Sequence, residues 1–153
     1  MIELKNGDLL LSNCDMICHQ VNAYGIMGAG IASQIKEAFP QMYKEYREIC
    51  KTVKNGDLYG TVWFYFYDKN KKAIANCFSQ IDGVTDIECL KACVRTLHLI
   101  AADRKFKTVG IPYKYGCGIA KGDWLEVVKV FKKEFELSNI RLQIWRLKKE
   151  VEQ

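Results

Sequence analysis

Apolar positions recur with two different periods along this chain, and the changes of period predict its secondary structure. Residues 16–21 form a short apolar run broken only by His19 and Gln20, the pattern of a buried strand whose end accommodates polar groups. A loop with three glycines in residues 25–30 follows. Helical spacing then continues up to Pro40, which ends the pattern; its apolar positions are Ile31, Ile35, Ala38 and Phe39.

The rest of the chain continues this alternation of strands and helices. The pattern predicts, in order, an amphipathic helix at 41–51, two strands joined by a polar turn within 61–78, a helix with its apolar face on 90–101, a strand at 108–112, a helix opened by Asp123 and a strand at 140–147. Such alternation favours the α/β class. We therefore expect a three-layer α/β/α sandwich around a mixed, largely parallel central sheet. Neither an internal repeat nor a linker interrupts the sequence, so residues 1–153 should form one domain.

The composition is that of a compact soluble protein. Apolar residues make up 49% and charged residues 27% of the chain, and only two prolines are present, which argues against disorder. No apolar stretch approaches the roughly 18 to 20 residues of a membrane helix. Glu3, Lys5 and Asp8 stand where a signal peptide would need apolar residues. We expect a cytoplasmic protein with no membrane partner.

The seven cysteines are predicted to be reduced thiols. Their number is odd, and Cys18, Cys77 and Cys93 lie within apolar runs, which disfavours a disulfide framework. Cys14, Cys18 and His19 are close enough in sequence to suggest metal ligands, but no Cys-x-x-Cys pair is present to complete a zinc site. We therefore expect neither a metal nor any other cofactor.

The formal net charge of +5 favours anionic ligands without identifying one. Part of the excess is local, because Lys69, Lys71 and Lys72 fall together in the predicted hairpin turn. A solvated surface explains these lysines at least as well as contact with nucleic acid does.

Two glycine-rich loops carry the strongest chemical signal. They occupy residues 22–30 and 113–122, and each follows a predicted strand and precedes a predicted helix. Glycine allows close backbone approach, so amides at a helix N-terminus can converge on a phosphate, whose charge the helix dipole favours. Both loops should lie at the carboxyl ends of strands, where open α/β sheets bind ligands, and together they suggest two phosphates or one diphosphate. Their spacing matches neither the Rossmann dinucleotide motif nor the P-loop, and the alternative is that the glycines only form tight turns.

Three segments resemble the successive ligand loops of macrodomains. They are residues 6–9 (NGDL), 21–32 (VNAYGIMGAGIA) and 111–124 (IPYKYGCGIAKGDW), in that order and spread over nearly the whole chain. The resemblance implies an ADP-ribose-binding α/β/α domain, with the diphosphate of the ligand between the two glycine loops. It is strongest to the branch that includes ADP-ribose 1″-phosphate phosphatases and the hydrolases that remove ADP-ribose from glutamate or from nucleic-acid bases.

The resemblance also implies roles for individual residues. Asp8 matches the acidic residue that accepts a hydrogen bond from the adenine amino group, and Asn22 matches the asparagine that contacts the distal ribose; a capping aspartate and a turn asparagine are the alternatives. Tyr113, Tyr115 and Trp145 are candidate walls for sugar or adenine, although ordinary packing explains such aromatics as well. The matched loop positions are Leu9, then Gly28, Ala29, Gly30 and Ile31, and finally Gly116, Cys117, Gly118, Ile119 and Ala120.

Candidates for catalysis are fewer. Several members of that branch carry a lysine near the position of Gln80 and an aspartate at the position of Ala120, so a lysine-based mechanism is disfavoured here because glutamine cannot form a Schiff base. His19 matches a histidine of the phosphatase-like members and could transfer a proton near neutral pH; a buried, hydrogen-bonded histidine is the alternative. Asp123 could assist as a base or simply cap the helix that it precedes.

These residues predict a protein that binds ADP-ribose or a derivative and hydrolyses a group at the distal ribose 1″ position. The candidate substrates are ADP-ribose 1″-phosphate, O-acetyl-ADP-ribose and an ADP-ribosylated target, with nucleic acid entering only as such a target. A non-catalytic ADP-ribose reader is the first alternative. A single-strand nucleic-acid binder that uses the aromatic residues 63–67 is the second.

Overall fold

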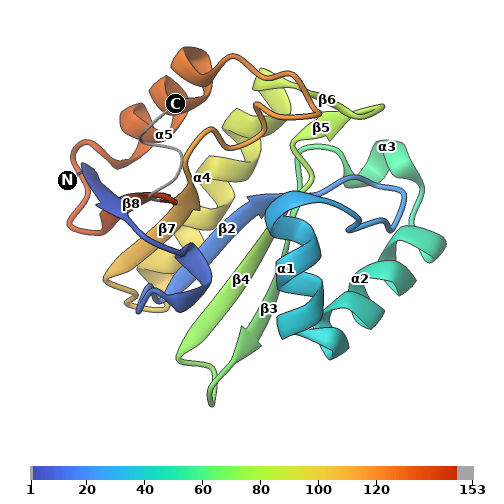
Figure 1. Ribbon diagram of the computed structural model, residues 1–153, viewed down its shortest axis with the longest axis horizontal. Helices are drawn as coiled ribbons and strands as arrows, with labels where there is room; N and C mark the ends of the chain where they lie inside the picture. Colours follow the sequence, from blue (N-terminus) through green and yellow to red (C-terminus); the bar gives the residue numbers. More distant parts are fainter. Residues whose placement is uncertain (1, 148–153) are drawn as a thin grey trace.

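The chain folds into three layers, with a central sheet between two pairs of helices (Figure 1). The structure, a computed structural model, describes residues 2–147. Its strands are β1 (Ile2–Asn6), β2 (Met16–Gln20), β3 (Val62–Tyr67), β4 (Lys72–Cys77), β5 (Gln80–Ile81), β6 (Val84–Thr85), β7 (Thr108–Pro112) and β8 (Arg141–Arg146). Its helices are the 3₁₀-helix η1 (Leu9–Leu11), α1 (Gly30–Ala38), α2 (Pro40–Thr52), α3 (Asn55–Leu58), α4 (Ile87–Asp103) and α5 (Trp124–Phe135).

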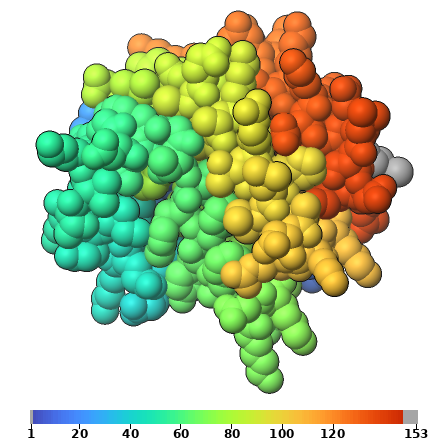
Figure 2. Space-filling view, turned by 180° about the vertical axis from the view of Figure 1, so that it is seen from behind, coloured from blue at the N-terminus to red at the C-terminus, as the bar shows by residue number. Residues whose placement is uncertain are grey.

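The central sheet has six strands in the order β1-β8-β7-β2-β4-β3. Every neighbouring pair is parallel except β3 and β4, which form an antiparallel hairpin. The predicted mixed, largely parallel sheet is thereby confirmed. The hairpin turn carries Lys69 and Lys71 and projects from the body of the molecule, as Figure 2 shows from behind. Its lysines are solvated, which accounts for part of the positive charge without a ligand.

Side chains that alternate along the strands divide the core into two clusters, one on each face of the sheet. On one face, α4 and α5 contribute buried residues such as Leu97 and Phe131. On the other face, α1 and α2 contribute Ile35, Met42 and Tyr46. The first face thus has two helices, while the second is covered by helices at one end only. Over β7 and β8 the segment of residues 7–15 packs on this face, where Leu9 and Cys14 approach Gly110 and Cys14 contacts Gln143 (Figure 1).

Three short features were not predicted from the sequence. They are η1, α3 and the small separate hairpin β5–β6. Strands of two residues leave no measurable period, and the four residues of α3 include Gly56, which disfavours a helix. The hairpin matters for the site because Thr85 in β6 contacts the second glycine loop.

None of the helices in residues 2–147 combines the length and the apolar character that a membrane crossing requires.

Candidate functional site

A cleft follows the edge of the sheet at which the parallel strands end. Three adjoining hollows form it, with volumes of about 550, 300 and 340 Å³. We call them the first, middle and last hollows. The first shares Gly30 and Gly116 with the middle one, and the middle one shares Ala29 and Gln80 with the last. Because each wall segment directly follows the carboxyl end of a parallel strand, the fold brings distant parts of the chain to one site.

All of the ligand-contact residues predicted from the sequence line this cleft. The first hollow includes Asp8, Leu9, Gly30, Ile31, Tyr113, Tyr115, Gly116, Cys117, Gly118 and Trp145. The middle hollow includes Ala29, Gly30, Ile31, Tyr115, Gly116, Gly118, Ile119 and Ala120. The last hollow includes Asn22, Gly28, Ala29, Ile119 and Ala120. His19 and Asp123 line none of the three.

The two glycine loops face each other across the middle hollow. On one side, α1 begins at Gly30, and its N-cap residue Ala29 provides no side-chain hydrogen bond. The first amides of a helix have no partner within the helix, so those of Gly30 and Ile31 remain available at the positive end of its dipole. On the other side, the amides of Gly118 and Ile119 donate no hydrogen bond to any residue in the range 2–147. The middle hollow therefore lies between two sets of free backbone donors.

A buried polar network holds the second glycine loop in place. The hydroxyl of Thr85 donates to the carbonyl oxygen of Gly116 at 2.6 Å and accepts from Nε2 of Gln20 at 3.0 Å. Oε1 of Gln20 accepts from the hydroxyl of Ser79 at 2.7 Å, and this hydroxyl also contacts the hydroxyl of Tyr115 at 2.7 Å. No local sequence signal distinguishes Gln20, Ser79 or Thr85, because they contact one another and the loop across 31 to 65 residues of chain.

Asp8 and three aromatic residues, which differ in how deeply they are buried, line the first hollow. Oδ1 of Asp8 accepts from the amide of Leu10 at 2.9 Å and caps η1, which leaves the second carboxylate oxygen outside the cap. Tyr113 is half-buried and packs edge-on against Trp124. Tyr115 also borders this hollow, but it is only 1% exposed and its ring packs against Phe131 in the core, a geometry that favours the packing alternative.

The side chain of Asn22 is largely used inside its own loop. Its Oδ1 accepts from the amides of Tyr24 and Ile26 and from the hydroxyl of Tyr46, while its Nδ2 donates to the carbonyl oxygen of Ile26. An amide nitrogen carries two hydrogens, so one N–H remains. Asn22 therefore first shapes residues 22–26 and can offer a single donor to the cleft.

The last hollow lacks charged side chains. Of the residues that line it, none is Asp, Glu, Lys, Arg or His, and Tyr24 is its one titratable side chain. The hydroxyl of Tyr24 donates to Oδ1 of Asp82 at 3.0 Å and so ties the first glycine loop to the β5–β6 hairpin; this contact raises the pKa of Tyr24. Ile26 and Ile119 add an exposed apolar rim, with exposed fractions of 60% and 83%.

His19 lies outside the cleft, in the core on the α1–α2 face. It is fully buried, and its Nε2 contacts Oδ1 of Asn76 at 2.6 Å. Asn76 in turn donates to Met42 and to the carbonyl oxygen of Trp63. Burial lowers the pKa of His19 to about 4, and the bond to Asn76 offsets only part of this shift. The ring is a neutral core group, so the expectation that it stands near the distal ribose is not supported by its position.

Asp123 is the N-cap of α5. Its Oδ1 accepts from the amide of Leu125 at 2.9 Å, and it is exposed outside the three hollows. The capping alternative is thus the one that the geometry supports.

The described residues contain no cluster of three or more His, Cys, Asp or Glu side chains that could hold a metal ion. The thiols of Cys14 and Cys18 are buried, and burial raises the pKa of both. They are packed, protonated groups rather than reactive thiolates.

The aromatic residues 63–67 form no exposed stacking platform. Trp63, Tyr65 and Tyr67 pack against the core on the α1–α2 face, and Phe64 and Phe66 against the core on the other face. All are half-buried. The nucleic-acid platform suggested by the sequence is therefore occupied by core packing.

Comparisons with known proteins agree with this geometry. The family model described as "Macro domain" matches residues 18–131. The DNA ADP-ribosyl glycohydrolase of Mycobacterium tuberculosis is 41% identical over 51 residues, which are 33% of this chain and 14% of that relative. The match therefore spans a small part of the length of that relative.

Two solved structures have the same fold. The macrodomain of Mycobacterium tuberculosis DarG aligns with a TM-score of 0.83 and 25% identity over 95% of this chain and 97% of that one. A structure of Thermosipho africanus DarTG in complex with ADP-ribose aligns with a TM-score of 0.78 and 21% identity over 94% of this chain and 41% of that one. At this identity the second likeness concerns the fold alone.

Proposed function

Because the chain belongs to the macrodomain family, we propose that it binds ADP-ribose in the cleft at the carboxyl edge of its sheet and hydrolyses conjugates of ADP-ribose at the distal ribose. The observation that carries the proposal is the middle hollow, about 300 Å³ in volume, between Gly30–Ile31 and Gly118–Ile119. Free amides on both sides are the donors that a diphosphate needs, and the N-terminus of α1 adds a favourable field for its charge.

The residues of the two outer hollows support one orientation of the ligand along the cleft. The first hollow offers the carboxylate of Asp8 and the rings of Tyr113 and Trp145, which suit a nucleobase that donates from an amino group and stacks on aromatics. The last hollow offers the one remaining N–H of Asn22 and the side-chain amide of Gln80, which can both donate to and accept from sugar hydroxyls. We therefore propose that adenine lies in the first hollow and the distal ribose in the last.

The substrate class follows from the lack of charge in the last hollow. A 1″-phosphate would need cationic partners there, but no Lys, Arg or His lines this hollow. A neutral, partly apolar group suits the rim of Ile26 and Ile119. Among the three candidate substrates, a nucleic-acid base joined to the distal ribose suits these walls best, and the name of the mycobacterial relative, a DNA ADP-ribosyl glycohydrolase, supports the same choice.

In the proposed reaction, water attacks C1″ of the distal ribose and the bond to the attached base breaks. The hydroxyl of water remains on C1″, and its second hydrogen goes to the leaving base. The residues of the cleft would contribute by positioning: the loop amides hold the diphosphate, and the Tyr24–Asp82 contact fixes the wall beside the last hollow.

A reader function is the second candidate, and a specific observation favours it. His19 is buried and neutral, Asp123 caps a helix, and the last hollow contains no carboxylate or histidine to activate water. A domain that only recognises ADP-ribose would need the same cleft and no such group.

Two measurements test the proposals in order. The first is thermal unfolding in the presence of ADP-ribose, AMP, ATP or NAD. A ligand at 100 times its dissociation constant adds roughly 2.7 kcal/mol to the free energy of unfolding. We expect ADP-ribose to raise the melting temperature most. No shift with ADP-ribose would refute the binding proposal.

The second measurement is turnover. An oligonucleotide carrying ADP-ribose on a base, ADP-ribose 1″-phosphate and O-acetyl-ADP-ribose are incubated with the protein, and released ADP-ribose is measured. Release from the oligonucleotide alone is the expected result. Binding of ADP-ribose without release from any of the three would establish the reader instead.

A further inference from the structure

Gln143 is a buried polar residue in the middle of β8, with an exposed fraction of 8%. In the sheet it lies between Glu3 of β1 and Gly110 of β7. On this face the segment of residues 7–15 packs against β7 and β8, through Leu9 and Cys14. A glutamine buried there must find partners for its amide, since an unpaired buried polar group costs free energy.

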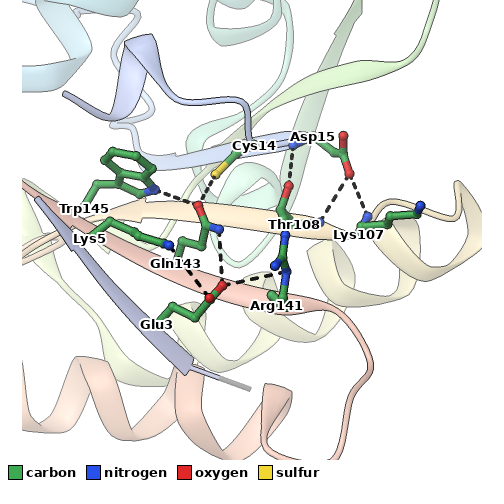
Figure 3. A network of polar contacts seen from close by, with 9 residues as sticks. All are labelled: Glu3, Lys5, Cys14, Asp15, Lys107, Thr108, Arg141, Gln143 and Trp145. Carbon is green, nitrogen blue, oxygen red and sulfur yellow. Dashed lines mark hydrogen bonds and ion pairs between the residues drawn. The ribbon is translucent and has the colours of Figure 1, made fainter. Parts of the chain in front are cut away.

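All of the polar atoms of this side chain have partners (Figure 3). Oε1 of Gln143 accepts from the indole Nε1 of Trp145 at 3.0 Å and from Sγ of Cys14 at 3.1 Å. Nε2 of Gln143 donates to Oε1 of Glu3 at 3.3 Å. An indole N–H can only donate and a carboxylate can only accept, so these two neighbours fix which end of the amide faces each of them.

The carboxylate at the end of this chain of contacts is itself held by cations. Glu3 lies 3.9 Å from Nζ of Lys5 and 3.8 Å from Nε of Arg141, as Figure 3 shows. Both cations contact the same carboxylate that accepts from Gln143. Burial raises the pKa of the Cys14 thiol, which keeps it protonated and able to donate. The polarity of the network therefore runs in one direction, from Trp145 and Cys14 through Gln143 to Glu3.

The two donors held by Gln143 belong to two different walls of the first hollow. Trp145 lines the hollow directly, and its ring lies against the backbone of Gly7, where an added Cβ would be 3.2 Å from Cζ3 of the indole. Cys14 belongs to the segment that carries Asp8 and Leu9. This segment packs down on the sheet only because Gly110 has no side chain: a Cβ there would lie 2.7 Å from both Cys14 and Leu9.

We infer that Gln143 is a positioning residue for the first hollow: by accepting from both Trp145 and Cys14, it sets the separation between the indole wall and the segment that carries Asp8. Gln143 lies beneath the hollow and does not line it. Its effect on a ligand is transmitted through Trp145 and Cys14. The inference rests on the proposed function, because it assigns this hollow to the base of the ligand.

Binding measurements with ADP-ribose test the inference. In Gln143→Leu, Trp145 and Cys14 lose their shared acceptor, so the dissociation constant for ADP-ribose should rise about tenfold. A tenfold rise corresponds to about 1.4 kcal/mol of binding free energy, near the upper end for one hydrogen bond. Trp145→Phe keeps a ring but removes the donor, so Gln143→Leu should weaken binding less in that background than in the wild type. The matched control is Gln41→Leu, which removes an exposed glutamine on α2 and should leave the dissociation constant unchanged.

A rescue variant guards against the possibility that Gln143→Leu fails to fold. Gln143→Glu places two carboxylates together and should weaken binding. The double variant Glu3→Gln with Gln143→Glu restores one donor and one acceptor in the reverse order, and it should recover most of the affinity. Either of two results would overturn the inference. One is wild-type affinity in Gln143→Leu. The other is a dissociation constant in the double variant Gln143→Leu with Trp145→Phe that has risen by the product of the two single-variant factors.

The indole Hε1 resonance of Trp145 separates this inference from the proposed function. It is assigned by its loss in Trp145→Phe among the three tryptophans of the chain, and it should move in Gln143→Leu even without ligand because its acceptor is gone. If the wild type does not bind ADP-ribose, the proposed function fails while the resonance still reports whether Gln143 holds Trp145. An unmoved resonance would refute the positioning role by itself.

Discussion

Thr85 and Gly116 are joined by a hydrogen bond of 2.6 Å from the threonine hydroxyl to the glycine carbonyl oxygen, across 31 residues of chain. The amide of Thr85 also donates to the carbonyl oxygen of Ala120 at 3.0 Å. One residue of a two-residue strand therefore holds the second glycine loop at two points, Gly116 and Ala120. Two residues between these contacts, Gly118 and Ile119, line the middle hollow, and their amides are free within residues 2–147.

Replacement of Thr85 by valine should loosen this loop. The change removes the donor to Gly116 and the acceptor for Gln20, so we expect the free energy of unfolding to fall by about 1 to 2 kcal/mol and ADP-ribose to bind several-fold more weakly. Urea unfolding and calorimetry measure the two effects. Thr96→Val is the control, because the hydroxyl of Thr96 bonds within α4 at Ala92; equal losses of affinity in both variants would contradict the prediction.

Gly116 should tolerate no side chain, whereas Gly118 should. Gly116 has φ of +67°, and an added Cβ would lie 2.8 Å from the hydroxyl oxygen of Thr85; at Gly118 no atom lies within 4 Å. We expect Gly116→Ala to lower the free energy of unfolding by about 1 to 3 kcal/mol and Gly118→Ala to change it by less than about 0.5 kcal/mol. Denaturation with urea distinguishes the two, and similar stability of both variants would show that the loop adapts.

Asp123 should be replaceable by another capping residue. Asp123→Ala removes the acceptor for the amide of Leu125 and should cost about 1 kcal/mol of stability. Asp123→Ser restores a cap but supplies no carboxylate. If the residue only caps α5, the serine variant should keep both wild-type stability and any hydrolase activity; a stable but inactive serine variant would restore Asp123 as a base.

His19 should make the fold sensitive to acid. Its pKa of about 4 in the folded protein lies below its ordinary value of 6.5. The unfolded chain therefore binds a proton between these pH values that the folded chain excludes, so this group's contribution to stability is complete above pH 6.5 and is lost as the pH falls toward 4. Between pH 7 and pH 5 the loss should be about 2 kcal/mol.

His19→Gln tests this assignment because it removes the titrating ring while keeping a polar group beside Asn76. Urea unfolding at pH 7 and pH 5 should show a smaller loss of stability in the variant than in the wild type. Identical losses would mean that other groups cause the acid sensitivity.

The residues of the glycine loops could be predicted from the sequence because their signal is local. Gly28–Ile31 and Gly116–Ala120 each follow a strand and precede a helix or its turn, and a largely parallel sheet brings the ends of its strands to one edge. The structure places both segments around one hollow. The local signal does not show that the amide of Asn22 is mostly used by Tyr24 and Ile26 of its own loop and by Tyr46 of α2.

The burial of single side chains could not be predicted from the local sequence, as His19 and Tyr115 show. His19 lies two residues from the carboxyl end of the apolar run that predicted its strand, but its side chain is fully buried and contacts Asn76 of β4, which in turn donates to Met42 of α2. Tyr115 is likewise adjacent to the cleft in sequence but turns its ring into the core against Phe131. The direction of a side chain at the end of a strand depends on the layer that packs against the strand. The local sequence does not contain that information.

The order of strands and helices, the two glycine loops and the absence of a paired-cysteine motif were determined by the sequence alone, since each depends on spacing within about twenty residues. Only the tertiary structure decided that Thr85 braces one loop, that Gln143 links two walls and that no charge lines the last hollow. These features join residues far apart in the chain, and their distances are fixed by the register of the sheet and the packing on its faces.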